Sequence, residues 1–201
     1  MSAEWMDPRQ RRTRVRLHKV IHELATTMPL DSITMADIAR AAEVKRDTVY
    51  RHAGSAVALL VQALEAEVED LVVLTSQLPA LSLTGESVFA GPEVSMFQHV
   101  AEHAEIYRNA LSSEASGPIR DMLIEASARA LTAHLQRHPD IAPLVNGRPA
   151  TESERRMFVA FAAAGTFGAM REWLFAGDLT DLEAAAAATL AAAPEWWMGR
   201  G

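Results

Sequence analysis

The fold is decided by one stretch, Ile33-Thr-Met-Ala-Asp-Ile-Ala-Arg-Ala-Ala-Glu-Val-Lys-Arg-Asp-Thr-Val-Tyr-Arg-His52. Thr34 and Asp37 stand three residues apart, the spacing of a capping box, which predicts that a short helix begins at this point. A tight turn over residues 42–44 follows, and then a second short helix over residues 45–52. The stretch therefore predicts two short helices joined by a tight turn.

The apolar and polar residues of this stretch fall on different sides of the two helices. Four apolar residues are spaced so that they pack between the helices: Ile38, Ala39, Val44 and Val49. The second helix then presents an outer face made of Lys45, Arg46, Asp47, Thr48, Tyr50, Arg51 and His52. A helix of this width fits the major groove of DNA, where its first side chains reach base edges. The pattern is that of a helix-turn-helix.

Helices are also expected on both sides of the motif. Asp7-Pro8 supplies an N-cap and a first-turn proline for a helix that runs to about Met28. After the motif, Ser55 can cap a long helix that reaches about Gln77. The first of these helices and the motif make a three-helix head, predicted as a DNA-binding domain of residues 1–54.

The remainder, residues 55–201, is predicted to be a helical bundle that binds an effector and dimerises. After a loop over residues 79–92, helices are expected over residues 93–111 with a break near His103, 119–138, 151–176 and 180–193. Two capping-box patterns open the last two helices, beginning at Thr151 and Thr180, and Gly177 ends the helix between them. No segment alternates with the period of a strand, so the predicted class is all-α.

The charge is divided unevenly along the chain. Of 201 residues, the first 60 hold ten Lys and Arg against seven Asp and Glu, whereas residues 61–201 hold nine against nineteen. A basic head suits a polyanionic partner, since DNA responds to the local field rather than to the total charge of −7. No cysteine is present, which excludes thiolate metal sites and disulfides, and no long apolar run predicts a membrane span. We expect a cytoplasmic protein without a membrane segment.

About residues 9–65 resemble the tetracycline-repressor (TetR) family of transcriptional regulators. The resemblance rests on the basic first helix, on Ile33-Thr-x-x-Asp-Ile-Ala-x-x-Ala42 and on Thr48-Val-Tyr-Arg-His52. It implies a homodimer that binds a palindromic operator in double-stranded DNA and is released from it by a small molecule. It also implies that Lys45, Arg46 and Thr48 approach bases, and that Thr34, Tyr50 and His52 anchor phosphates.

Three positions depart from the family's pattern. Glu43 stands where the turn usually has glycine, Ala53 replaces an aromatic residue, and Ala56 replaces a lysine. The first change is costly if the turn needs a left-handed backbone, and the last removes one phosphate contact. The arginines of the first helix, between Arg9 and Arg16, offer other contacts to the DNA backbone.

An effector cavity is expected among the middle helices, where aromatic residues, methionines and a few polar tips are mixed. The residues predicted to bind the effector are Met96, His99, His103, Tyr107, Met122, Phe158 and Phe161. Such a lining suits an apolar or aromatic effector, although for any one of these residues a place in the ordinary core is the favoured interpretation. We expect no cofactor and no metal.

His99-Val-Ala-Glu-His103 also spells an inverted zinc-peptidase motif. Its spacing puts two imidazoles on one helix face with Glu102 as a base, but a third ligand is not identified by spacing. A zinc hydrolase is therefore the weaker alternative, and we do not expect an enzyme. A second alternative is a ligand-binding helical protein whose DNA head is weakened, in view of Glu43, Ala53 and Ala56.

Small residues are dense in the last two expected helices, notably over residues 160–169, 184–188 and 191–193. Small side chains let helices approach closely, so these segments are predicted to pair with a second copy as a four-helix interface. Trp173, Trp196 and Trp197 are expected at its edge or at the end of the chain. The alternative is that alanine reflects helix propensity or a compositional bias, since the chain has 17 Arg and 2 Lys.

Overall fold

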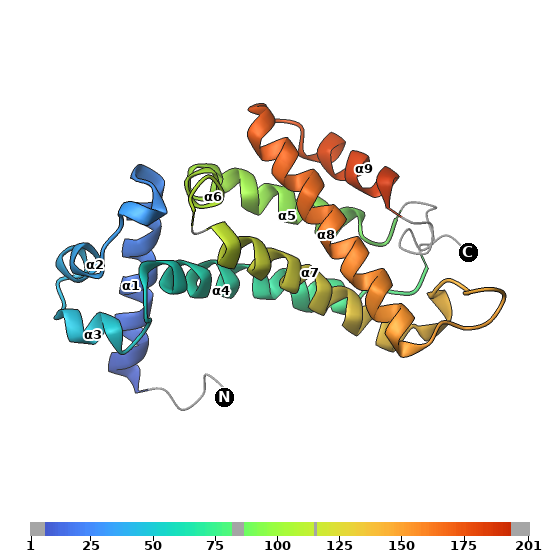
Figure 1. The fold of residues 1–201 in the computed structure, drawn as a ribbon, viewed down its shortest axis with the longest axis horizontal. Coiled ribbons are helices and arrows are strands. Elements are labelled where there is room, and N and C mark those ends of the chain that lie inside the picture. The colour runs from blue at the N-terminus through green and yellow to red at the C-terminus, as the bar shows by residue number, and fades with distance from the viewer. Residues whose placement is uncertain (1–6, 82–86, 115, 194–201) are drawn as a thin grey trace. The chain divides into compact units, whose positions relative to one another are not determined.

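The protein is all-α, as predicted, in a computed structural model that describes residues 7–81, 87–114 and 116–193. Over these residues there is no strand, and a single isolated bridge joins Val145 and Arg148. Figure 1 shows the helices, which are α1 (Pro8–Thr27), α2 (Met35–Ala41), α3 (Arg46–Tyr50), α4 (Ala56–Ser76), α5 (Ala90–Glu102), α6 (Ala104–Leu111), α7 (Ser116–Arg137), α8 (Glu152–Ala176) and α9 (Leu182–Ala192). Two short 3₁₀ helices, Leu30–Ser32 and Pro139–Ile141, lie in the connections. None of the described helices is both long enough and apolar enough to cross a membrane.

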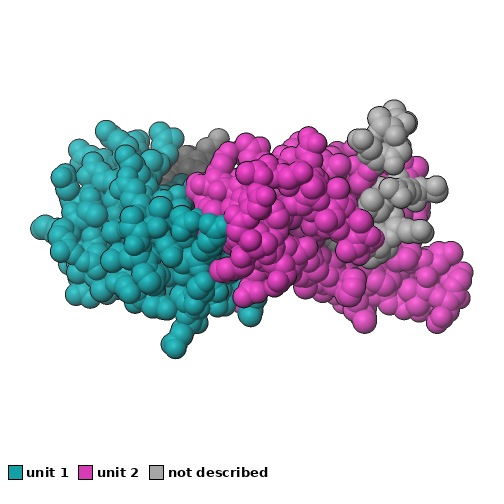
Figure 2. Space-filling view, turned by 90° about the horizontal axis from the view of Figure 1, so that it is seen from above, with its two compact units in different colours: residues 1–67, 105–120 teal, residues 68–104, 121–201 magenta. Residues whose placement is uncertain are grey.

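The chain forms two compact units, coloured teal and magenta in Figure 2. Unit 1 contains residues 1–67 and 105–120, and unit 2 contains residues 68–104 and 121–201. The predicted boundary at residue 54 falls inside unit 1, because α4 continues the head and residues 105–120 return to it. The functional division at 54 stays a prediction.

Unit 1 packs α1, α2 and α3 around buried side chains that the sequence pattern predicts. Leu17, Ile21, Ile38, Val49 and Leu59 are fully buried. The returning segment adds Ile106 and Tyr107 to the buried set. It is also hydrogen-bonded to the head: the Asn109 side chain donates to the carbonyl of Ala25 at 2.8 Å, near the end of α1.

Unit 2 contains α5, α8 and α9 with the second half of α4 and most of α7. Helix α5 packs against α9 and α8. One buried apolar cluster is formed by Phe89, Leu131, Leu135, Val159, Ala162 and Leu190. The ring of Trp173 meets Phe97 edge to face, with centroids 4.8 Å apart, so Trp173 belongs to this packing. Trp196 and Trp197 lie outside the described residues.

Several helix ends follow from local chemistry that the sequence displays. The side chain of Asp7 accepts a hydrogen bond from the Arg9 amide at the start of α1. Reciprocal capping boxes begin α2 and α8, at Thr34 and Thr151. Gly177 ends α8 with φ 96°, a left-handed conformation that glycine adopts without a steric penalty. The break at His103, between α5 and α6, is also confirmed.

Three predicted helix starts are wrong. Helix α5 begins at Ala90 rather than Glu93, and α7 begins at Ser116 rather than residue 119. In each of these two helices a proline, Pro92 or Pro118, lies in the first turn, where a missing amide hydrogen costs nothing. Helix α9 is capped by Asp181, whose side chain accepts from the Ala184 amide, while the Thr180 hydroxyl donates to Asp178.

Candidate DNA interface and effector cavity

The turn between α2 and α3 is a Schellman motif. The Val44 amide donates to the Ala39 carbonyl at 2.9 Å, and the Glu43 amide donates to the Arg40 carbonyl at 3.2 Å. These two bonds satisfy carbonyls at the end of α2 and require a left-handed residue between them. Glu43 is that residue, with φ 52°. The predicted strain at this position is therefore confirmed.

Replacing Glu43 by glycine should stabilise the protein by about 0.5–1 kcal/mol, because glycine relieves the left-handed strain but loses more entropy on folding. The quantity to measure is the free energy of unfolding in urea, at one fixed protein concentration. Glu43→Ala is the control, since it removes the charge and keeps the Cβ atom that causes the strain. If alanine stabilises the protein as much as glycine, charge rather than backbone conformation explains the gain.

Helix α3 is anchored on one side and open on the other. Val49 is fully buried, and Tyr50, the next residue, is 46% exposed. The other predicted DNA contacts of the second helix also lie at the surface: Lys45, Arg46, Asp47 and Arg51 are exposed, and Thr48 and His52 are half-buried. The structure thus brings all seven of them together on α3 and the residues that flank it in unit 1.

Arg46 and Tyr50 hold each other on the exposed side of α3. The Arg46 guanidinium donates to the Tyr50 hydroxyl at 3.0 Å and lies over the ring, 5.4 Å from its centroid. Arg51 donates in the same way to the Thr48 hydroxyl at 3.2 Å. Each arginine is thereby oriented before any partner arrives, and each keeps donors for a base edge or a phosphate.

A groove in unit 1 gathers basic and amide side chains from three helices. It is lined by Arg9, Gln10, Thr13, Arg14, Thr48, Arg51, His52 and Gln62. Burial, Arg51 and Arg14 lower the pKa of His52, in that order of importance. Burial, Arg14 and His52 lower the pKa of His18 in the same way. The groove is therefore a positively charged surface in which an anion is favoured.

The sequence prediction missed part of this surface and did not foresee how Thr34 is used. Gln10, Thr13 and Gln62 were not predicted, because a polar residue on an exposed helix face carries no signal of its own. Thr34 is exposed, but its hydroxyl already donates to the Asp37 carboxylate. A phosphate at Thr34 would have to compete with Asp37 for that hydrogen.

A cavity lies in unit 2 among α4, α5, α7 and α8. Its volume is about 50 Å³, it is partly open to solvent, and its wall is mainly apolar. The wall is formed by Leu71, Val72, Thr75, Phe89, Pro92, Glu93, Met96, Ala126, Ser127, Ala130, Leu131 and Thr166. Met96 is the one predicted effector residue among them. Glu93 was not predicted, although an acid in register with Phe89, Met96 and Phe97 on the apolar side of α5 is a readable signal.

The other predicted effector residues are dispersed. Tyr107 is buried in unit 1, Met122 is buried in unit 2, Phe158 is half-buried and Phe161 is 71% exposed. The rings of His99 and His103 lie 4.8 Å apart in unit 2. Glu102, the base of the hydrolase alternative, is exposed and accepts a hydrogen bond from Gln98 at 2.9 Å. A role for these residues in binding stays a prediction.

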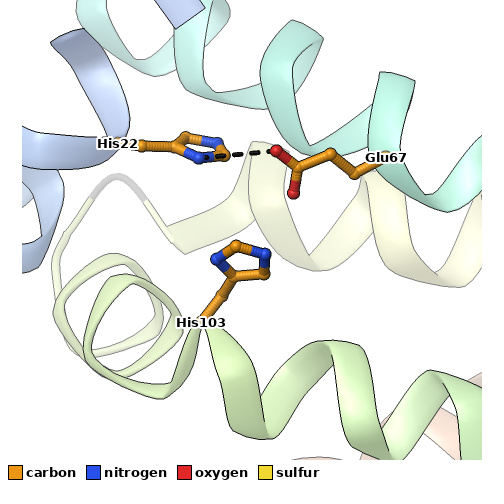
Figure 3. A group of neighbouring side chains, drawn as sticks. All are labelled: His22, Glu67 and His103. Carbon is orange, nitrogen blue, oxygen red and sulfur yellow. Dashed lines mark ion pairs between the residues drawn. The ribbon is translucent and has the colours of Figure 1, made fainter. Parts of the chain in front are cut away.

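Unit 1 also contains an ion pair that the sequence did not predict. Figure 3 shows the His22 ring of α1 directed at the Glu67 carboxylate of α4, with 3.4 Å between Nδ1 and Oε1. His103, also labelled there, belongs to unit 2. The pair joins the first helix of the head to α4, which are far apart in sequence.

No protein-family model and no curated protein matches the sequence. Solved structures do match over most of the chain. The TetR-family repressor AlkX of a Dietzia species is 17% identical, with 99% of this chain and 100% of that chain covered and a TM-score of 0.57. The repressor NalD of Pseudomonas aeruginosa is 19% identical, covering 92% and 97%, with a TM-score of 0.54. RolR in complex with resorcinol is 20% identical, covering 91% and 88%, with a TM-score of 0.56.

The chain has the fold of TetR-family regulators. Within this TetR fold, α8 carries an exposed apolar face made of Met157, Ala160, Phe161, Ala164 and Phe175. Each of the first four stands three or four residues from two of the others, and Phe175 follows Ala164 by eleven residues, about three helical turns, so all five lie on one side of α8. In α9, which packs on α8, five alanines are exposed as well, at positions 184, 187, 188, 191 and 192.

Proposed function

We propose that the chain is a homodimeric transcriptional repressor that reads a palindromic operator with α3 and is released by a small-molecule effector. The observation that carries this proposal is the placement of α3, with Val49 buried and Arg46, Tyr50 and Arg51 open to a partner. The TetR fold supports it, since AlkX and NalD, which share the fold, are described as repressors. The protein is proposed to act in the cytoplasm and to have no enzymatic activity.

Selection of bound sequences from a random DNA pool tests this function directly. The expected product is a palindrome whose half-sites are separated by roughly one helical turn, about 35 Å between the two α3 helices. A gel-shift assay should then show that the selected site competes at least about 1,000-fold better than random DNA. Enrichment of no site, or of a site without two-fold symmetry, would contradict the proposal.

The dimer is proposed to form through α8 and α9. In an isolated protomer the apolar face of α8 would be exposed to water, and its large side chains would contribute no free energy of burial. The alanines of α9 allow a second copy to approach closely, and a two-fold pair of four helices covers both surfaces. Two half-sites in DNA require such a symmetric protein.

The effector is proposed to enter the cavity of unit 2. Its wall combines Phe89, Met96 and Leu131 with the polar side chains of Glu93 and Ser127, as small-molecule sites do. The resorcinol complex of RolR shows that the fold has held a small aromatic molecule. An effector releases DNA only if it binds more tightly to a dimer whose half-site spacing does not fit the operator.

Operator affinity should fall as the pH rises, because of His52. In the free protein its pKa is lowered, and a DNA phosphate in the groove would stabilise the protonated ring, so binding takes up a proton. As the pH rises from the lowered pKa of His52 in the free protein to its higher pKa in the complex, the operator affinity should drop by up to about tenfold for each unit of pH. Fluorescence anisotropy with labelled operator at pH 5.5–8 measures this dependence. His52→Gln should flatten it and His138→Gln, in unit 2, should not; equal curves for wild type and His52→Gln would contradict the assignment.

A ligand-binding protein with a weakened DNA head is the second candidate. The strained Glu43 favours it, as does Ala56, which is buried and presents no group to DNA. Failure of the DNA selection, together with small-molecule binding in unit 2, would replace the first proposal by this one.

A further inference from the structure

Glu93 is the unexplained residue of unit 2. It lies on α5 in the wall of the cavity and is only 8% exposed. Its Oε1 atom is buried and has no hydrogen-bond partner among the described residues. Unpaired buried carboxylates are costly and are kept only where something compensates the cost. The residue therefore points to a partner that is not part of the chain.

The position of Glu93 in the first turn of α5 does not by itself explain its burial. An acid near a helix N-terminus is favoured by the dipole, and a capping carboxylate accepts amide hydrogens. Among the described residues no amide donates to the Glu93 Oε1 atom, and the Glu93 backbone amide donates to the Phe89 carbonyl at 2.9 Å as part of the helix. Its carboxylate is therefore available to a ligand in the cavity and is not used to cap the helix.

The rest of the cavity wall, as far as the structure describes it, supplies no positive charge. Of the described residues that line it, Glu93 is the only ionisable one. His134 on α7, whose ring lies 5.0 Å from that of Phe89, is buried without a partner for either ring nitrogen among the described residues. Burial and the nearby His138 and Arg137 lower the pKa of His134 to about 4, so its ring is neutral at pH 6–8.

We propose that the cavity binds a small apolar cation, an amine with a hydrocarbon body, whose ammonium group pairs with the Glu93 carboxylate. The hydrocarbon body contacts Phe89, Met96 and Leu131, and the hydroxyls of Ser127 and Thr166 border the same space. An ammonium group would donate hydrogen bonds to the buried carboxylate and would neutralise its charge. This inference rests on the proposed function only in treating such a molecule as the effector.

The protonation of Glu93 in the ligand-free protein is consistent with a role in binding a cation. Burial alone raises the pKa of Glu93 to about 7, since no charged group contributes to the shift. The acid is thus largely neutral below pH 7, which limits its cost in the free protein, and an incoming cation would draw off its proton. Cation binding is therefore expected to release a proton and to strengthen as the pH rises from 6 to 8.

Three probes with one ring and different charges test the inference: benzylammonium, benzyl alcohol and benzoate. Calorimetric titration of the full chain at pH 8 should show benzylammonium binding at least about tenfold more tightly than benzyl alcohol, and benzoate more weakly than either. Glu93→Gln should abolish the preference for the cation and leave benzyl alcohol affinity within about twofold. Glu102→Gln, an exposed acid on the same helix, is the matched control and should keep the preference.

The results separate this site from the DNA-binding function. Equal affinity for benzylammonium and benzyl alcohol, absence of benzylammonium binding at millimolar concentration, or an unchanged preference in Glu93→Gln would overturn the site. A thermal unfolding midpoint for Glu93→Gln at or above that of the wild type shows that the variant is folded. If the cation binds and the DNA selection fails, the repressor function falls while the site remains.

Discussion

Replacing Phe161 by arginine is expected to convert the dimer into monomers and to abolish tight operator binding. Phe161 is the most exposed large apolar side chain of α8, and Met157 beside it is 67% exposed. In a two-fold interface the new guanidinium would face the guanidinium of the partner protomer. Each would lose its hydration without gaining a carboxylate to pair with, which costs about 3–5 kcal/mol per buried charge. Analytical ultracentrifugation measures the change in mass.

The loss of the dimer should also be visible in DNA binding. A monomer engages one half-site and loses the gain from joining two, so its affinity for the operator should fall at least about 100-fold. Leu144→Arg is the matched control, because Leu144 is 65% exposed but lies in the connection before α8. A Phe161→Arg protein that stays dimeric would show that α8 is not the interface.

Arg46→Ala is expected to have the second largest effect, a loss of about 1–3 kcal/mol in operator binding, or about 5–150-fold in Kd. The guanidinium stands at the start of α3 and has two donors of the geometry that guanine accepts at O6 and N7. Its loss should weaken discrimination at one base pair of each half-site. A second round of selection with the variant protein shows whether one position has become degenerate.

Two further variants separate base reading from general charge. Tyr50→Phe keeps the ring under Arg46 but removes the hydroxyl that receives its hydrogen bond, so a smaller loss is expected, about 1 kcal/mol. Arg137→Ala removes the same charge from an exposed site of α7 in unit 2 and should change neither affinity nor sequence preference. If Arg46→Ala lowers the affinity for random DNA as much as for the operator, Arg46 contacts phosphate rather than a base.

The helices of the head were predictable because their ends are determined by interactions between residues that are close in the sequence. The capping box of Thr34 and Asp37 and the apolar spacing around Val49 require only neighbours a few residues away. The first turns of α5 and α7 were missed because a Gly-Pro or Pro signal is the same at a helix start as in a loop. Local pattern does not distinguish the two.

The effector residues could not be assigned in the same way. Tyr107, Met122 and Phe161 give one and the same apolar signal in the sequence, and they lie respectively in the core of unit 1, in the core of unit 2 and at the surface. Which apolar position faces a core, a cavity or a second copy depends on long-range packing. Glu93 was the better indicator, because a charged residue in an apolar register must be explained by its surroundings.

Unit 1, which contains the head, is assembled from two distant pieces of chain. Residues 105–120 return to it, and Asn109 is bonded to the end of α1. A cut after the fourth helix would therefore uncover the surface that Ile106 and Tyr107 fill. To transplant the DNA reader onto another protein, an engineer would have to carry both pieces and rejoin them with a designed linker.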